Sequence, residues 1–207
     1  MNSSFLFFGQ IALVILCLTH VVALVVQFGL PRDTVRTLGT LFLSCFSLML
    51  LTDALAWYGI HWVFYYPSIY GVLLATMGAA WPAFVWLGIL DHPTQLHRKV
   101  LWRVPILGAL AGHAMGLDAG LVIFLVGWLT GSVLILYHYR EQRYVARVAL
   151  TQAVVAFAYW IFIKAGILVG AQVCLAIWII LTHRIVNAFM VKNSLRVFSA
   201  ESSEVRA

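Results

Sequence analysis

Residues 5–30 read FLFFGQIALVILCLTHVVALVVQFGL, an apolar stretch without a single Asp, Glu, Lys or Arg. A helix needs roughly 20 such residues to cross the hydrocarbon core of a bilayer, so this stretch is long enough to span one. The whole chain of 207 residues has the same character: 63% of the residues are hydrophobic and 10% are charged. Its mean hydropathy is +0.98. A soluble domain carries about a quarter charged residues, so the sequence predicts an integral membrane protein.

The apolar pattern repeats along the chain and predicts an all-α, polytopic transmembrane bundle of about seven spans. We expect these spans at about residues 5–30, 37–58, 62–90, 101–117, 119–138, 147–167 and 171–191. The third span is unusually long and contains Pro67 and Pro82, so it is expected to tilt and kink. The fourth span is short. A helical hairpin that turns near residues 115–118 and a re-entrant loop both fit it.

Basic residues mark one side of the predicted bundle as cytoplasmic. Twelve of the 13 Lys and Arg residues fall in segments that can share one side, and Lys164 is the exception. Because this asymmetry sets the cytoplasmic face, seven crossings place the N-terminus outside and the C-terminus inside. We therefore expect a multi-pass protein of the cytoplasmic (inner) membrane. Residues 1–192 form its transmembrane domain and residues 193–207 a short, disordered cytoplasmic tail.

Composition and motifs exclude several classes of protein. The net charge of +6 lies in short clusters between apolar spans, so topology explains it and no nucleic-acid partner is expected. The three cysteines lie inside apolar spans without a CxxC pair, which predicts buried thiols rather than disulfides. Residues 171–191 lack the lysine that a retinal protein needs. The HExxH and GxSG motifs are also absent, so we predict no catalytic residues or metal site and lean against an enzyme.

Glycines recur every four residues along the fourth predicted span, at Gly108, Gly112, Gly116 and Gly120. Such a stripe lets helices approach closely, which is a main source of attraction between helices in lipid. Two interpretations fit this stripe. It packs the fourth span tightly inside the bundle, or it forms the seam of a homo-oligomer or larger membrane complex through Gly108, Gly112 and Gly116. The lipid bilayer is the partner that the sequence requires.

Ionisable residues inside apolar spans are costly, so each is a candidate site residue. At 1.5 Å per residue, Asp53 lies roughly 8 Å below the outer boundary, His113 roughly 6 Å and Lys164 about 5 Å. His61 and Asp118 lie just above them in outer turns, and Tyr58 is nearby in sequence. If these faces converge, they form a polar pocket open to the outside, in which Lys164 or His113 pairs with Asp53. In the simpler alternative, Lys164 extends to the headgroups and His61 is an interfacial residue.

A second pair of candidates lies deeper in the bundle. His20 on the first span and His183 on the last are each roughly 10–15 Å from the inner boundary. Two neutral imidazoles at similar depth can ligate a haem b or relay protons, and two histidines hydrogen-bonded within the bundle are the simpler alternative. His92 and His97 lie in a basic loop, and their spacing suits no common metal site.

These residues favour three functions. The first, which we favour, is a small transporter, channel or solute-binding component, with protonation of Asp53 or His113 gating an outward-facing pocket. The second is a sensory or accessory subunit that reports a ligand to a cytoplasmic partner. The third is an electron-transfer subunit that holds haem b between His20 and His183. An intramembrane enzyme acting on lipid at the outer face is a further alternative.

Overall fold

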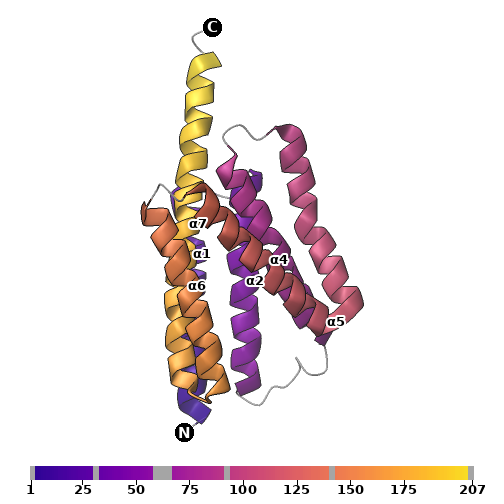
Figure 1. Cartoon of the computed structure of the whole chain (residues 1–207), viewed down its shortest axis with the longest axis vertical. Helices are drawn as coiled ribbons and strands as arrows, with labels where there is room; N and C mark the ends of the chain where they lie inside the picture. Colours follow the sequence, from indigo (N-terminus) through magenta and orange to yellow (C-terminus); the bar gives the residue numbers. More distant parts are fainter. Residues whose placement is uncertain (1–2, 30–32, 58–66, 91–93, 140–142, 205–207) are drawn as a thin grey trace.

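The computed structural model describes residues 3–29, 33–57, 67–90, 94–139 and 143–204, and these residues form an elongated helical bundle (Figure 1). The helices of this part of the chain are α1 (Ser3–Phe28), α2 (Thr34–Trp57), α4 (Pro67–Ile89), α5 (Gln95–His138), α6 (Arg143–Lys164) and α7 (Leu168–Glu204). All six are long and apolar enough to cross a membrane. The protein is therefore an all-α bundle with the helices of a membrane protein.

The fourth and fifth expected spans belong to one long helix, α5, which is interrupted at Gly116. The backbone there is non-helical, with φ 80° and ψ −161°, a conformation that glycine adopts without a side-chain clash. We call residues 95–115 the first arm of α5 and residues 117–138 the second arm. The first arm begins earlier than expected because the Thr94 hydroxyl caps it, accepting a hydrogen bond from the backbone N–H of His97 at 3.3 Å.

Both arms of α5 pack on α4 through glycines. The closest pairs consist of small residues: Gly112 and Gly120 beside Gly71, Gly108 beside Ala75, and Gly127 beside Gly78. Residue numbers increase along α4 while those of its contacts on the first arm decrease, from Gly112 to Gly108. Its contacts on the second arm increase, from Gly120 to Gly127. The first arm therefore runs antiparallel to α4 and the second parallel to it, so α5 reverses direction at Gly116 (Figure 1). In the glycine stripe, Gly108, Gly112 and Gly120 therefore pack against α4 of the same chain.

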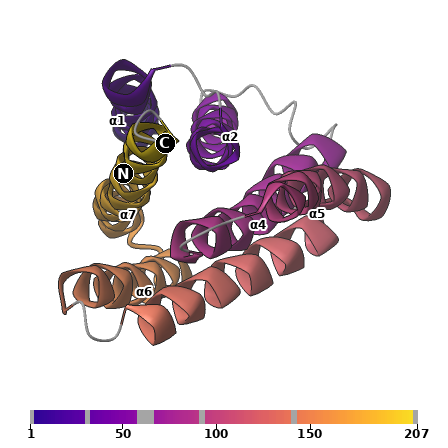
Figure 2. The ribbon, with the colours of Figure 1, turned by 90° about the horizontal axis from the view of Figure 1, so that it is seen from above.

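Helix α7 lies at one side of the bundle (Figure 2). Seen from above, α7 lies between α1 and α6, while α2 lies between α1 and α4 (Figure 2). The arms of α5 cover the side of α4 that faces away from α2 (Figure 2). The helices that carry the sequence-predicted histidines, α1 and α7, are therefore direct neighbours.

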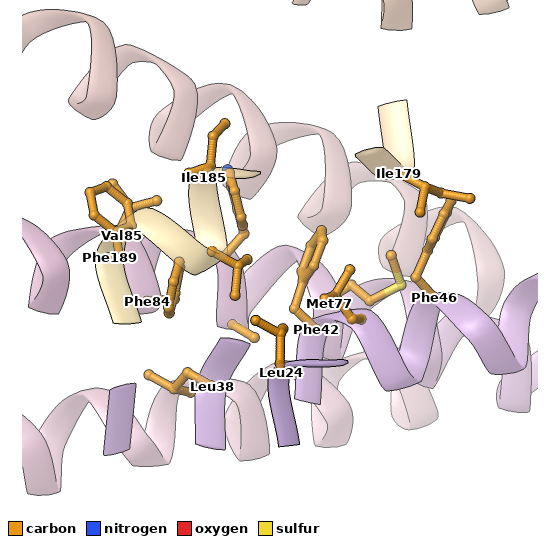
Figure 3. Close-up of a cluster of buried hydrophobic side chains, with 14 of the residues drawn as sticks. Leu24, Leu38, Phe42, Phe46, Met77, Phe84, Val85, Ile179, Ile185 and Phe189 are labelled. Atoms are coloured by element: carbon orange, nitrogen blue, oxygen red, sulfur yellow. The ribbon is translucent and has the colours of Figure 1, made fainter. Parts of the chain in front are cut away.

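Large apolar side chains of α1, α2, α4 and α7 meet in a continuous core (Figure 3). The ring of Phe42 lies 5.0 Å from that of Trp81 on α4 and 6.0 Å from that of Trp178 on α7. The Phe46 ring lies 4.9 Å from the Trp178 ring. Such tilted aromatic pairs have defined geometry, so they fix how the helices are rotated against one another.

The three cysteines are free and buried, as predicted from their apolar surroundings. The C-terminal segment differs from expectation. Helix α7 continues to Glu204, past the apolar segment Leu168–Ser194, and projects beyond the other helices (Figure 1). It thus includes most of the residues that we expected to form a disordered tail. No glycine or proline interrupts residues 193–204, and extending a helix costs far less than starting one.

Candidate functional site

Asp53 lies near the C-terminal end of α2, where it meets side chains of two other helices. Its Oδ1 atom accepts a hydrogen bond of 3.0 Å from the hydroxyl of Tyr70 on α4. Tyr159 of α6 is near enough to interact electrostatically with the Asp53 carboxylate. We call Asp53, Tyr70 and Tyr159 the Asp53 cluster. The hydrogen bond in this cluster links α2 to α4.

Lys164 and His113, the residues expected to pair with Asp53, are both exposed. Lys164 is exposed in the last turn of α6, with its ammonium group 5.5 Å from the centre of the Trp160 ring in a cation–π contact. His113 is exposed on the first arm of α5. Neither forms an ion pair with Asp53 within the described part of the chain. Residue numbers predict how deep each side chain lies in the membrane. They do not predict the direction in which it points, because that depends on how the helix is rotated about its axis.

Tyr70 is the member of the site that sequence reasoning missed. A tyrosine in an apolar span needs a hydrogen-bond partner for its hydroxyl, and this requirement could have indicated Tyr70 as a partner of Asp53. Asp53 lies just before the end of α2 and Tyr70 just after the start of α4, so two antiparallel neighbours bring them to one depth. The other two candidates of this region, Tyr58 and His61, lie outside the described residues.

A second polar contact joins α7 to α1 near the start of both helices. The side-chain amide of Gln172 donates a hydrogen bond of 2.8 Å to the backbone carbonyl of Leu6. Gly9, one turn further along α1, leaves room for the Gln172 side chain, which a methyl group at position 9 would meet. This contact fixes the register of α7 on α1.

His20 and His183 meet at the interface of α1 and α7. Their rings are stacked, with centroids 4.3 Å apart and an interplanar angle of 24°. Both residues are half-buried, and the buried His20 Nε2 and His183 Nδ1 atoms have no hydrogen-bond partner among the described residues. The sequence-based expectation that these two histidines share one depth thus corresponds to a direct ring contact. Two imidazoles this close cannot both carry a positive charge without strong repulsion.

The stacked geometry does not fit the haem that the pair suggested. Axial histidines bind iron from opposite faces of the porphyrin, with the edge of each ring directed at the metal. Rings stacked face to face at 4.3 Å leave no space for a porphyrin between them. His20 and His183 are therefore not arranged as the two axial ligands of a haem b.

A third polar contact lies beside the histidine pair and joins α6 to α7. The amide of Gln152 donates a hydrogen bond of 2.6 Å to the hydroxyl of Thr182, which in turn donates to the carbonyl of Trp178 at 2.8 Å. Gln152 and Thr182 are both fully buried. Thr182 precedes His183, so this contact helps to hold the stretch of α7 that carries the histidine.

The opposite end of the bundle is held by Arg36 at the start of α2. Its guanidinium forms an ion pair of 3.0 Å with Asp33 and donates to the carbonyl of Phe28 at the end of α1. It also donates to the hydroxyl of Ser194 on α7 at 3.3 Å. One arginine thus links three helices, which is a structural role for a residue that the sequence assigned only to topology.

Comparisons with protein-family models, with curated protein sequences and with solved structures give no match for this chain. Within the described ranges, no group of three or more His, Cys, Asp or Glu side chains is gathered in a way that could hold a metal ion. The chemistry of the candidate site consists of a carboxyl group beside two tyrosines and a stacked pair of imidazoles.

Proposed function

We propose that this chain is a small, proton-coupled membrane transport protein that crosses the bilayer seven times. Each arm of α5 has about 20 residues, enough to cross a hydrocarbon core, and each of the other helices crosses once. Opposite directions of the two arms along α4 support this path. With the arginine-rich turns in the cytoplasm, the N-terminus and the Gly116 turn lie outside and the C-terminus inside.

The observation that carries the proposal is the hydrogen bond between Asp53 and Tyr70 inside an apolar bundle. A carboxylate within a bilayer is costly unless it is protonated or paired. Asp53 receives a hydrogen bond from Tyr70, and among the described residues no cation pairs with it. A protonated carboxyl group can donate as well as accept, so proton binding would change how α2 and α4 hold one another. This exchange links a proton to a helix movement.

The histidine pair supplies a second protonatable group, deeper in the bundle. The thiol of Cys17 on α1 contacts the carbonyl of Leu43 on α2 at 3.5 Å, which sets the register of these helices. Asp53 lies ten residues from this level in the outward direction, and His20 lies three residues in the inward direction. The Asp53 cluster and the His20–His183 pair are thus about 20 Å apart along the bundle. A proton that crosses the membrane would meet the two groups in turn.

Reconstituted vesicles test this proposal. Purified protein is placed in liposomes that contain a pH-sensitive dye, and a panel of small organic anions, cations and neutral solutes is added one at a time. We expect at least one solute to change the internal pH in wild-type vesicles. Asp53→Asn keeps the size of the side chain but cannot bind the proton, so it should abolish that change. His113→Gln, at an exposed position, is the matched control and should keep the wild-type rate.

Two results would contradict the proposal. One is solute uptake that is the same in wild-type and Asp53→Asn vesicles and does not respond to a proton gradient. The other is the lack of any solute-dependent proton movement across the whole panel in vesicles whose protein is folded and correctly inserted. For every variant, circular dichroism measures the helical content and so establishes folding. Sedimentation of the protein together with the vesicles, after the detergent has been removed, establishes insertion.

A second candidate function is that of a sensory or accessory subunit, and the length of α7 favours it. Helix α7 extends to Glu204, beyond its apolar segment, on the side assigned to the cytoplasm. A helix that continues out of the bundle can transmit a change at His183 to a partner. If the protein is such a subunit, a partner protein should co-purify with it, and truncation after Ser194 should release that partner. If the protein is a transporter alone, no partner should co-purify, and the truncation should leave transport unchanged.

A further inference from the structure

We propose that the groove between α6 and α7 binds an anionic phospholipid through Arg184. The groove is a shallow surface crevice that encloses only about 10 Å³, so a ligand would lie along it rather than enter it. It is lined by Tyr144, Val145, Val148, Arg184, Ile185 and Ala188. The lining thus combines one cation and one phenol with a continuous apolar wall, which matches a phosphate group joined to a hydrocarbon chain.

Arg184 has no acidic partner in the described part of the protein. Its side chain is exposed and forms neither an ion pair nor a side-chain hydrogen bond with the described residues. It nevertheless lies within the apolar segment Leu168–Ser194, in the half near Ser194. A cation at this depth is costly and must find an anion or reach the headgroup layer. On a lipid-facing surface, the anion at hand is a lipid phosphate.

The surroundings of Arg184 favour a headgroup with a net negative charge. A guanidinium binds a phosphate through two parallel hydrogen bonds, which suits this ligand better than a single point charge does. Arg147, one helical turn from Tyr144 on α6, is also exposed and adds a second cation beside the groove. Tyr144 is 61% exposed near the start of α6, at the depth where tyrosine rings contact headgroups. Basic pockets between membrane helices on the cytoplasmic side bind anionic headgroups in this way.

Native mass spectrometry of the full-length protein in detergent tests the site. The protein is titrated with phosphatidylglycerol and, separately, with phosphatidylcholine that has the same acyl chains. We expect the first phosphatidylglycerol to bind more tightly than the first phosphatidylcholine. Arg184→Gln should weaken its binding by roughly fivefold, because a basic residue near the membrane surface contributes about 1 kcal/mol to anionic lipid binding. Lys99→Gln, an exposed lysine on the same side of the bundle, is the control and should have no effect.

A second variant separates the groove from its charge. Ala188→Leu fills the groove without removing a cation, so it should weaken binding of the first phosphatidylglycerol while leaving the helical content unchanged. The proposal is overturned if the wild-type protein does not distinguish the two lipids, or if Arg184→Gln binds phosphatidylglycerol like the wild type. It is also overturned if Lys99→Gln loses as much affinity as Arg184→Gln, since the attraction would then belong to the basic surface as a whole.

Discussion

Substituting alanine for Gly71 tests the packing of α4 between the two arms of α5. The added methyl group would lie 2.6 Å from the carbonyl oxygen of Gly116 and 3.0 Å from that of Gly112, and neither backbone atom can rotate away. Non-bonded contacts are most favourable at about 3.5–4.0 Å, so α4 and the arms must separate by roughly 1 Å. Overpacking of this kind costs about 1–3 kcal/mol.

Thermal unfolding in detergent, followed by tryptophan fluorescence, measures this cost. We expect the Tm of Gly71→Ala to fall by roughly 2–12 °C, from about 2–4 °C for each kcal/mol in a chain of this size. The control is Val122→Ile, which adds one carbon on the exposed face of the second arm, where the side chain is 59% exposed. Its Tm should match that of the wild type. If Gly71→Ala behaved like Val122→Ile, α5 would not enclose α4 and the hairpin would be wrong.

Three further variants test single contacts by the same unfolding measurement. Tyr70→Phe removes the hydrogen bond to Asp53 and should reduce the free energy of unfolding by about 1–3 kcal/mol, whereas wild-type stability would show that the bond is not formed. Gln152→Leu removes the hydrogen bond to Thr182, whose hydroxyl keeps its bond to the Trp178 carbonyl. We therefore expect the free energy of unfolding to fall by only about 0.5–2 kcal/mol, and a larger fall would contradict these hydrogen bonds. Gly116→Ala forces a side chain into a backbone conformation with φ 80° and should cost about 1–3 kcal/mol, unless α5 runs straight through this position.

The sequence predicted the class of fold and several helix boundaries because lipid imposes strong constraints. An apolar run such as residues 5–30 has to form a helix that bonds its own backbone, and α1 covers Ser3–Phe28. The sequence placed a turn near residues 115–118, as a helical hairpin or a re-entrant loop, and α5 reverses direction at Gly116. The glycine stripe likewise indicated a close helix contact. Its partner was left open, because a stripe of small residues serves internal and external contacts equally well.

Residue numbers predict the depth of each candidate side chain, but they do not predict the direction in which it points. Residue numbers predict comparable depths for Asp53, His113 and Lys164. In the structure Asp53 contacts Tyr70, the Lys164 ammonium lies over the Trp160 ring, and His113 is exposed. Helices that are apolar on nearly every face give little information on their rotation, since both lipid and core accept the same side chains. His20 and His183 are different, because each is the polar residue of a largely apolar face, and their contact follows from avoiding lipid.

The most direct test of the seven-crossing bundle is the side of the membrane on which the two ends of the second arm lie. Single cysteines are introduced as Asp118→Cys and Glu141→Cys in a chain whose three native cysteines have been replaced, and intact cells are treated with a membrane-impermeant maleimide. We expect Asp118→Cys to be labelled from outside, and Glu141→Cys to be labelled only after the membrane is permeabilised. Labelling of both positions from the same side would contradict it.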